Sequence, residues 1–161
     1  MPSPTEMMSP TAADLTALGQ RARTAARALL RATHAQRVAA LHALADLLEQ
    51  QHATILAANA EDLARGEAAG LPANLLDRML LNPERLHAIA ADTRTVAALP
   101  DPLDEQYDFA VLPSGLTRYR QRTPLGVVGM IYEARPNVTV DAAALCIKSG
   151  NAVVLRGGSD I

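Results

Sequence analysis

The sequence predicts an α/β fold in which N-terminal helices precede the start of a parallel, Rossmann-like sheet, with a β-hairpin inserted between the two parts. Two observations carry this prediction. Apolar residues recur at spacings of three and four through most of the first hundred positions, which indicates amphipathic helices. Short β-branched apolar runs at 127–132 and 152–155 flank a segment of helical length, and this order is typical of a βαβ unit.

Composition limits the function classes. The chain has 161 residues and a net charge of -2, and its arginines are interleaved with acidic residues, so nucleic-acid binding has no electrostatic support. No apolar run approaches the roughly 18–20 residues that cross a bilayer. The single cysteine cannot form an internal disulfide, and the N-terminus lacks the features of a signal peptide. These features predict a cytoplasmic protein of one domain.

The first elements are a tail and a helix. Residues 1–9 are rich in Pro, Ser and Thr without periodicity, which predicts a flexible tail. Ser9 and Pro10 fit an N-cap followed by proline at the first helical position. One helical stripe then contains Leu15, Leu18, Ala22, Ala25 and Leu29.

Three more helices are expected in the segment 10–105. Thr33 and Gln36 fit a capping box and predict a second helix. A third helix is expected over 53–65, ending at Gly66. Asn82 followed by Pro83 repeats the cap-plus-proline start and predicts another helix.

A hairpin is expected at 106–124, after a connector with two prolines and three acids. Runs of strand-forming residues at 107–112 and 116–122 are separated by a Pro-Ser-Gly turn. Arginines alternate with Tyr119 in the second run. Such alternation can bind nucleic acid, but the run is short and follows acids, so we favour a solvated face or, better, an edge that pairs with another subunit.

Residues 125–161 form the expected βαβ unit, whose strands should present ligands at their carboxyl ends. Asn137 follows the first strand and has two interpretations: an N-cap, which spacing favours, or an amide donor to a developing oxyanion. Glu133 and Arg135 are substrate-binding candidates or a structural ion pair. After the second strand, Gly157 and Gly158 suit either a simple turn or a loop that approaches a phosphate or ribose.

Other reactive side chains give weaker signals. Cys146 lies inside an apolar helical segment, so we interpret it as buried packing and not as a nucleophile. The four histidines, His34, His42, His52 and His87, lack paired metal-ligand spacing, and no metal site is predicted. The G-x-G-x-x-G fingerprint of a standard dinucleotide cradle is absent.

The stretches "YEARPNVT" and "KSGNAVVLRGGS" closely resemble the gamma-glutamyl phosphate reductases of the aldehyde dehydrogenase superfamily. The resemblance covers nearly the whole chain, weakly at first and strongly at the end. It implies an aldehyde-dehydrogenase-type cofactor domain with an oligomerisation hairpin. It also implies NADPH-dependent reduction of L-glutamyl 5-phosphate to glutamate 5-semialdehyde in proline biosynthesis.

The resemblance also assigns residues. Asn137 matches the oxyanion-stabilising asparagine, and the cofactor-binding residues would be Tyr132, Arg156, Gly157, Gly158 and Ser159. Serine instead of an acid at 159, together with Arg156, implies a preference for NADP over NAD. The family's nucleophilic cysteine has no counterpart here, so we expect about the first two-fifths of a longer enzyme, inactive alone and with an exposed apolar sheet edge.

The last predictions concern the binding partners and two alternative functions. The resemblance implies a homo-oligomer, glutamyl 5-phosphate as the small-molecule substrate and a glutamate 5-kinase as a partner. Within enzymes, the alternative is another aldehyde dehydrogenase relative, such as a CoA-acylating one. From a different class, the alternative is a non-catalytic adaptor with a degenerate nucleotide-binding fold.

Overall fold

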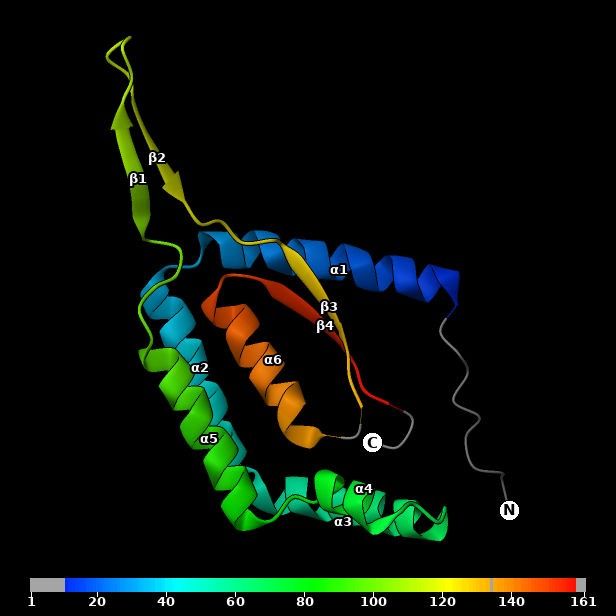
Figure 1. The fold of residues 1–161 in the computed structure, drawn as a ribbon. Coiled ribbons are helices and arrows are strands. Elements are labelled where there is room, and N and C mark those ends of the chain that lie inside the picture. The colour runs from blue at the N-terminus through cyan, green and yellow to red at the C-terminus, as the bar shows by residue number, and fades with distance from the viewer. Residues whose placement is uncertain (1–10, 134, 159–161) are drawn as a thin grey trace.

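The computed structural model describes residues 11–133 and 135–158, and within them it confirms the α/β prediction (Figure 1). The predicted tail at 1–9 lies outside the described residues. The helices and strands follow in the order α1 Ala12–Arg31, α2 His34–Gln50, α3 His52–Ala68, α4 Ala73–Met79, α5 Pro83–Ala98, β1 Gln106–Val111, β2 Thr117–Gln121, β3 Val127–Ile131, α6 Pro136–Lys148 and β4 Ala152–Arg156.

Side-chain caps begin three of the helices. The predicted capping box of Thr33 and Gln36 begins α2, and the predicted Asn82 cap with Pro83 begins α5. The predicted Ser9 cap of α1 is wrong. Thr11 caps this helix instead, because its hydroxyl accepts from the Asp14 amide while the Asp14 carboxylate accepts from the Thr11 amide.

The end predicted for α3 is also wrong. Gly66 is buried inside this helix, where a Cβ would lie 3.0 Å from a methyl of Leu71 and 3.0 Å from one of Leu76. Glycine therefore permits close packing of α4 on α3, and sequence periodicity did not predict α4. The helix ends before Gly70, whose φ of 75° is the left-handed conformation that glycine favours.

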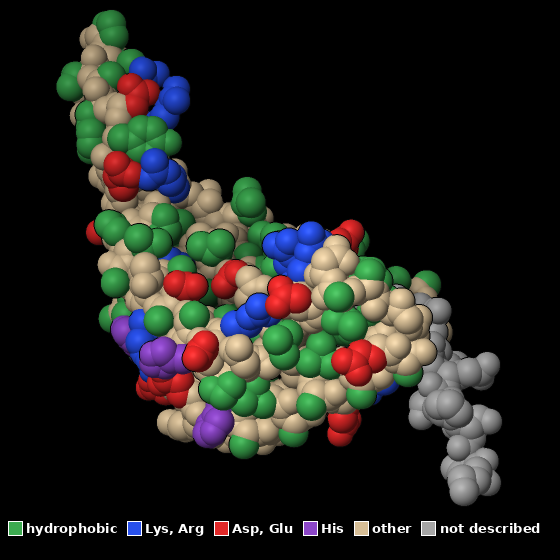
Figure 2. All heavy atoms as spheres, turned by 60° about the horizontal axis from the view of Figure 1, so that its bottom comes forward, with side chains coloured by type: hydrophobic (Ala, Val, Ile, Leu, Met, Phe, Trp, Pro, Cys, Tyr) green, Lys and Arg blue, Asp and Glu red, His purple; other side chains and the backbone are tan. Residues whose placement is uncertain are grey.

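The β1–β2 hairpin was predicted to within about a residue at each end. The strands pair antiparallel and project from the helical body (Figure 1). Phe109 packs on Tyr119 with ring centroids 5.7 Å apart, yet both remain exposed. Figure 2 shows basic and hydrophobic side chains gathered along this projection.

The parallel pair β3–β4 forms the centre of a layered unit. Val127 pairs with Ala152 and Ile131 with Arg156. Figure 1 shows α1 along one face of the two strands and α6 along the other, with α2 and α5 beyond α6. Ile131 is 86% exposed, which confirms the expected apolar exposure at this sheet.

The hydrophobic core lies where α2, α5 and α6 meet. Leu41, Ala97 and Ala144 are buried there, with Val38, Val96 and Ile147 packed around them. Alanines let the helix axes approach closely, so the chain's alanine content supports this packing. None of the helices in the described part of the chain is long and apolar enough to span a membrane.

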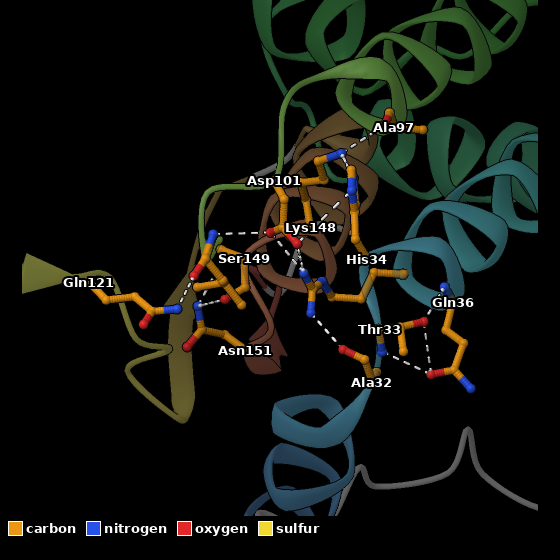
Figure 3. Close-up of polar contacts among 12 residues, drawn as sticks. Ala32, Thr33, His34, Gln36, Ala97, Asp101, Gln121, Lys148, Ser149 and Asn151 are labelled. Atoms are coloured by element: carbon orange, nitrogen blue, oxygen red, sulfur yellow. Dashed lines mark hydrogen bonds and ion pairs between the residues drawn. The ribbon is translucent and has the colours of Figure 1, made fainter. Parts of the chain in front are cut away.

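A partly buried set of polar side chains, here called the Lys148 cluster, connects the C-terminal end of α6 to its neighbours (Figure 3). It consists of Lys148, His34, Arg37 and Asp101. The Lys148 ammonium donates to the Ala97 carbonyl at 2.8 Å and lies 2.9 Å from Nε2 of His34. The Arg37 guanidinium donates to both Asp101 carboxylate oxygens, at 2.8 and 2.6 Å.

Burial and neighbouring charges shift the pKa of two members of this cluster, Lys148 and Asp101. Burial lowers the pKa of Lys148, which the nearby Asp101 partly opposes. Burial alone would raise the pKa of Asp101, but the Leu103 amide and the charges of Arg37 and His34 together hold it below the ordinary value. The cluster thus connects the start of α2, and the segment between α5 and β1, to the C-terminal end of α6.

Candidate active site

The carboxyl end of β3 leads into a corner that positions Tyr132. The Tyr132 amide donates to the Arg156 carbonyl at 3.1 Å, which extends the parallel ladder by one bond. Its hydroxyl lies 2.6 Å from Oγ1 of Thr139 on the second turn of α6. Backbone and side chain therefore fix this residue between β4 and α6.

Helix α6 begins two residues earlier than an Asn137 cap would require. Pro136 occupies the first turn, since its fixed φ suits that position, and extended Arg135 is the N-cap without a side-chain cap bond. The N-cap interpretation of Asn137 is therefore wrong. Its Nδ2 instead donates to Oδ2 of Asp141, one turn along the helix, at 3.1 Å.

Asp141 is the only acid on helix α6. Burial raises the pKa of its carboxyl, and the hydrogen bond from Asn137 acts in the opposite direction. The negative charge of Asp92 on α5 raises the pKa further. The carboxylate is therefore partly desolvated and close to a second acid.

The loop after β4 holds the predicted glycines. The Arg156 side chain is exposed and donates to the Gly157 carbonyl at 2.5 Å. Gly157 and Gly158 are partly buried. Ser159, the residue predicted to discriminate between cofactors, lies outside the described residues.

Two neighbouring cavities open at this edge of the sheet. The larger, of about 530 Å³, is mainly apolar and includes Tyr132 and Gly157 in its wall, with residues from α2, α3 and α5 opposite. The smaller, of about 370 Å³, carries charged side chains and includes Arg135 and Asn137. Pro136 lies in the walls of both cavities.

The structure thus brings several predicted residues together. Tyr132 and Gly157 meet at the apolar cavity, and Arg135 and Asn137 meet at the charged one. Glu133, Arg156 and Gly158 are not among the residues lining these cavities. Glu133 and Arg135 form no ion pair within residues 11–133 and 135–158, although the Arg135 amide donates to the Glu133 carbonyl at 2.7 Å.

Sequence reasoning missed the contribution of distant segments. Asp92 on α5 and Asn59 on α3 reach these cavities from elements that have no local motif. Asp141 did carry a signal, because it follows Asn137 at helical spacing and is the only acid between Glu133 and Ser159.

In the described part of the chain, neither Cys146 nor the histidines add a nucleophile or a metal centre to the site. Cys146 is buried on α6, and burial raises the pKa of its thiol, so it is packing as predicted. Among the residues that the structure describes, no three His, Cys, Asp or Glu side chains gather as a metal site would require.

Comparisons with known proteins agree on one group of enzymes. A gamma-glutamyl phosphate reductase from Chloroflexus aurantiacus is 60% identical over 148 residues, which are 92% of this chain and 35% of that protein. The reductase of the same name from Roseiflexus castenholzii is 58% identical over 150 residues, 92% of this chain and 36% of that protein. No protein-family profile matches the chain.

Solved structures give the same result. The gamma-glutamyl phosphate reductase of Thermotoga maritima matches with a TM-score of 0.88 and 38% identity, over 91% of this chain and 35% of that one. The Saccharomyces cerevisiae reductase matches with a TM-score of 0.86 and 32% identity, over 94% of this chain and 38% of that one. The chain thus spans about a third of the length of the relatives that it matches. In sequence and in fold, the chain is similar to the N-terminal third of the gamma-glutamyl phosphate reductases.

Proposed function

We propose that the native-length gene product reduces L-glutamyl 5-phosphate to L-glutamate 5-semialdehyde with NADPH, releasing phosphate, in proline biosynthesis. The observation that carries the proposal is the place of Asn137, which lies in a charged cavity directly beside an apolar one at the carboxyl edge of a parallel sheet. The names of relatives up to 60% identical support the same reaction.

The chemistry assigned to this edge is acyl transfer followed by reduction. A cysteine thiolate attacks the acyl phosphate carbonyl, the bond to the phosphate oxygen breaks, and a thioester forms. A nicotinamide cofactor held at this edge would supply the hydride that reduces the thioester, and breaking of the carbon–sulfur bond would release the aldehyde and restore the thiolate. Asn137 Nδ2 donates to the oxyanion of each tetrahedral stage.

The nucleophile is not Cys146. That thiol is buried and its pKa is raised, whereas a nucleophile must be an accessible thiolate. Since it is the only cysteine of the chain, we place the nucleophile outside these 161 residues. The 161-residue chain alone is therefore expected to lack reductase activity.

The cofactor site is assigned to Tyr132, Arg156, Gly157, Gly158 and Ser159. The apolar cavity at Tyr132 and Gly157 suits a flat, apolar part of a dinucleotide. The exposed Arg156 guanidinium would pair with a 2′-phosphate, which favours NADP over NAD. Glu133 and Arg135 are assigned to the substrate.

The remaining assignments concern organisation. We divide the chain into the helical part of a cofactor domain at 10–105, an oligomerisation hairpin at 106–124 and the first βαβ unit at 125–161. The hairpin would join copies of the enzyme into a homo-oligomer. A cytoplasmic location and a glutamate 5-kinase partner complete the proposal.

The test is NADPH formation from glutamate 5-semialdehyde, measured with and without inorganic phosphate. We expect activity that requires phosphate in the native-length gene product and none in the 161-residue chain. Activity that is indifferent to phosphate would identify another aldehyde dehydrogenase, and absence of activity in the native-length protein would contradict an enzyme.

A further inference from the structure

More charged side chains line the charged cavity at the start of α6 than form salt bridges there. Six charged side chains line it: Asp77, Arg78, Arg85, Asp92, Arg135 and Asp141. Arg85 and Asp77 neutralise each other, since the guanidinium donates to the carboxylate at 2.8 Å. This salt bridge therefore accounts for only two of the six charged side chains that line the cavity.

Among the residues that the structure describes, the other four charged side chains of the cavity form no salt bridge. Asp92 and Asp141 are near enough for the charge of one to raise the pKa of the other. Within residues 11–133 and 135–158, neither carboxylate forms a salt bridge, and neither does Arg135. In the part of the chain that the structure describes, two acids (Asp92 and Asp141) and two arginines (Arg78 and Arg135) thus line one cavity of about 370 Å³ without forming salt bridges.

The two acids would oppose the proposed role of Asn137 unless a cation pairs with them, and within the described residues neither Arg78 nor Arg135 forms a salt bridge with them. Asp141 Oδ2 lies 3.1 Å from the amide nitrogen of Asn137. An oxyanion bound to that amide at about 3 Å would thus lie within roughly 6 Å of the carboxylate. Two nearby negative charges would oppose the charge that develops in the reaction.

The proposed substrate carries the cation that resolves this conflict. The α-ammonium of a glutamyl group is joined to its reacting carbonyl by a short aliphatic chain, and its α-carboxylate adds a negative charge beside the ammonium. A cavity with acids next to Asn137 and an unpaired arginine in its wall has complementary charges for both groups.

We propose that Asp92 and Asp141 bind the α-ammonium of the substrate and that Arg135 pairs with its α-carboxylate, so that the cavity selects α-amino acids. The inference rests on the proposed function and deepens it. The ammonium neutralises the two acids only when an amino-acid substrate is bound, and in that state Asn137 can stabilise the oxyanion without opposition. Discrimination should therefore appear in kcat as well as in KM.

Three aldehydes separate the two contacts in the phosphate-dependent oxidation by the native-length protein. L-Glutamate 5-semialdehyde has both groups, 5-oxopentanoate lacks the amino group, and 4-aminobutanal lacks the carboxylate. The variants are Asp92→Asn, Asp141→Asn and Arg135→Gln, with exposed Asp104→Asn as the control. Each variant is compared with the unchanged protein on one substrate at one pH, so spontaneous cyclisation of the amino aldehydes cancels.

We expect each Asp→Asn variant to lose about 10-fold in kcat/KM with both amino aldehydes, the usual cost of a charge-assisted bond. The same variants should keep or raise kcat/KM with 5-oxopentanoate, because a carboxylate that this substrate cannot neutralise has been removed. Arg135→Gln should show the opposite pattern, losing activity with the two carboxylate-bearing aldehydes and keeping it with 4-aminobutanal.

An equal loss with all three aldehydes would overturn the inference, because it would mean that Asp141 only orients Asn137 or supports the fold. Exposed Asp92 provides the second variant should Asp141→Asn fail to fold. Failure of the proposed function gives a different result, namely no phosphate-dependent oxidation of any aldehyde by the unchanged protein.

Discussion

The two ends of helix α6 carry polar side chains of similar kinds in opposite situations. At the C-terminal end, Lys148 is 3% exposed, and its ammonium is held by the Ala97 carbonyl and His34. At the N-terminal end, the Asn137 side chain has one hydrogen bond within the described residues, to Asp141, and the nearby Arg135 is exposed. Satisfied, buried polar groups stabilise a fold, whereas unpaired groups beside a cavity are available to a ligand.

The contrast extends to the loops at each end. After α6, Gly150 adopts a φ of 73° and packs so tightly that a Cβ would lie 2.9 Å from Pro124. Asn151 then accepts from the Gly126 amide at 2.9 Å, closing the base of the sheet. Before α6, Arg135 caps the helix without any side-chain bond. One end of the helix is locked by packing, and the other opens to solvent.

The largest expected effect is on catalysis at the open end. Asn137→Ala in the native-length protein should lower kcat by about 10²–10³-fold, the usual cost of removing one oxyanion donor. The temperature of unfolding should hardly change, because Asn137 is only partly buried. Steady-state kinetics and a thermal melt check both, with exposed Asn74→Ala as the control. A kcat that stays within a few-fold of the original value would contradict the claim that the N-terminal end of α6 is catalytic and the C-terminal end structural.

The next effect is on stability at the locked end. Asp101→Asn removes the partner of buried Arg37 and should lower the free energy of unfolding by about 3 kcal/mol. Asp46→Asn, which weakens an exposed pair with Arg94, should cost less than about 1 kcal/mol. Chemical denaturation measures both. Equal costs would show that burial does not set the strength of these pairs.

The Asp101 effect should depend on pH. The folded-state pKa of Asp101 is lowered from 3.8, so its contribution is complete well above that value and is lost as pH falls through the lower folded-state pKa. The difference in stability between the unchanged protein and Asp101→Asn should therefore narrow in strong acid. A difference that grows on acidification would contradict the assigned charge state.

A smaller effect is expected on cofactor choice. Arg156→Ala should reduce the ratio of kcat/KM for NADPH over NADH by about 10-fold, because one charge-assisted contact with a 2′-phosphate is lost. Arg118→Ala on the hairpin is the matched control. An unchanged ratio would remove Arg156 from the cofactor site.

The smallest effect is expected from Cys146→Ala. The thiol lies on the buried side of α6, so kcat should not change and the free energy of unfolding should fall by only about 1 kcal/mol. In the unchanged protein, peptide mapping after brief alkylation should find Cys146 unmodified until the fold is opened. Rapid alkylation or loss of kcat would reopen the question of which cysteine is the nucleophile.

Local signals made much of the fold predictable. Thr33 with Gln36 and Asn82 with Pro83 mark helix starts through bonds that lie within four residues, so the sequence contains the whole cause. Helix α4 and the burial of Gly66 were not predictable in this way. They arise from contacts of Gly66 with Leu71 and Leu76, which form only after α3 and α4 have folded against each other.

The sequence predicted the site residues that follow β3 and β4, but not those that α5 contributes. Tyr132, Asn137 and Gly157 follow strands that the apolar pattern marks, so their shared edge could be inferred from βαβ geometry. Asp92 lies on α5, far away in sequence, and its approach to Asp141 depends on how α5 packs on α6. No local sequence pattern indicates how α5 packs on α6. For the same reason, the burial of Lys148 against Ala97 and His34 was not predicted.

The most direct test of the account is hydrogen–deuterium exchange of the native-length protein with and without NADPH. We expect slower exchange at the Gly157 and Gly158 amides after β4. No change is expected at Ser149, Gly150 and Asn151, which already donate to helix carbonyls, or at Tyr132, whose amide already donates to the Arg156 carbonyl. Protection confined to the locked end, or absent from the strand ends, would contradict the claim that this edge of the sheet is the cofactor site.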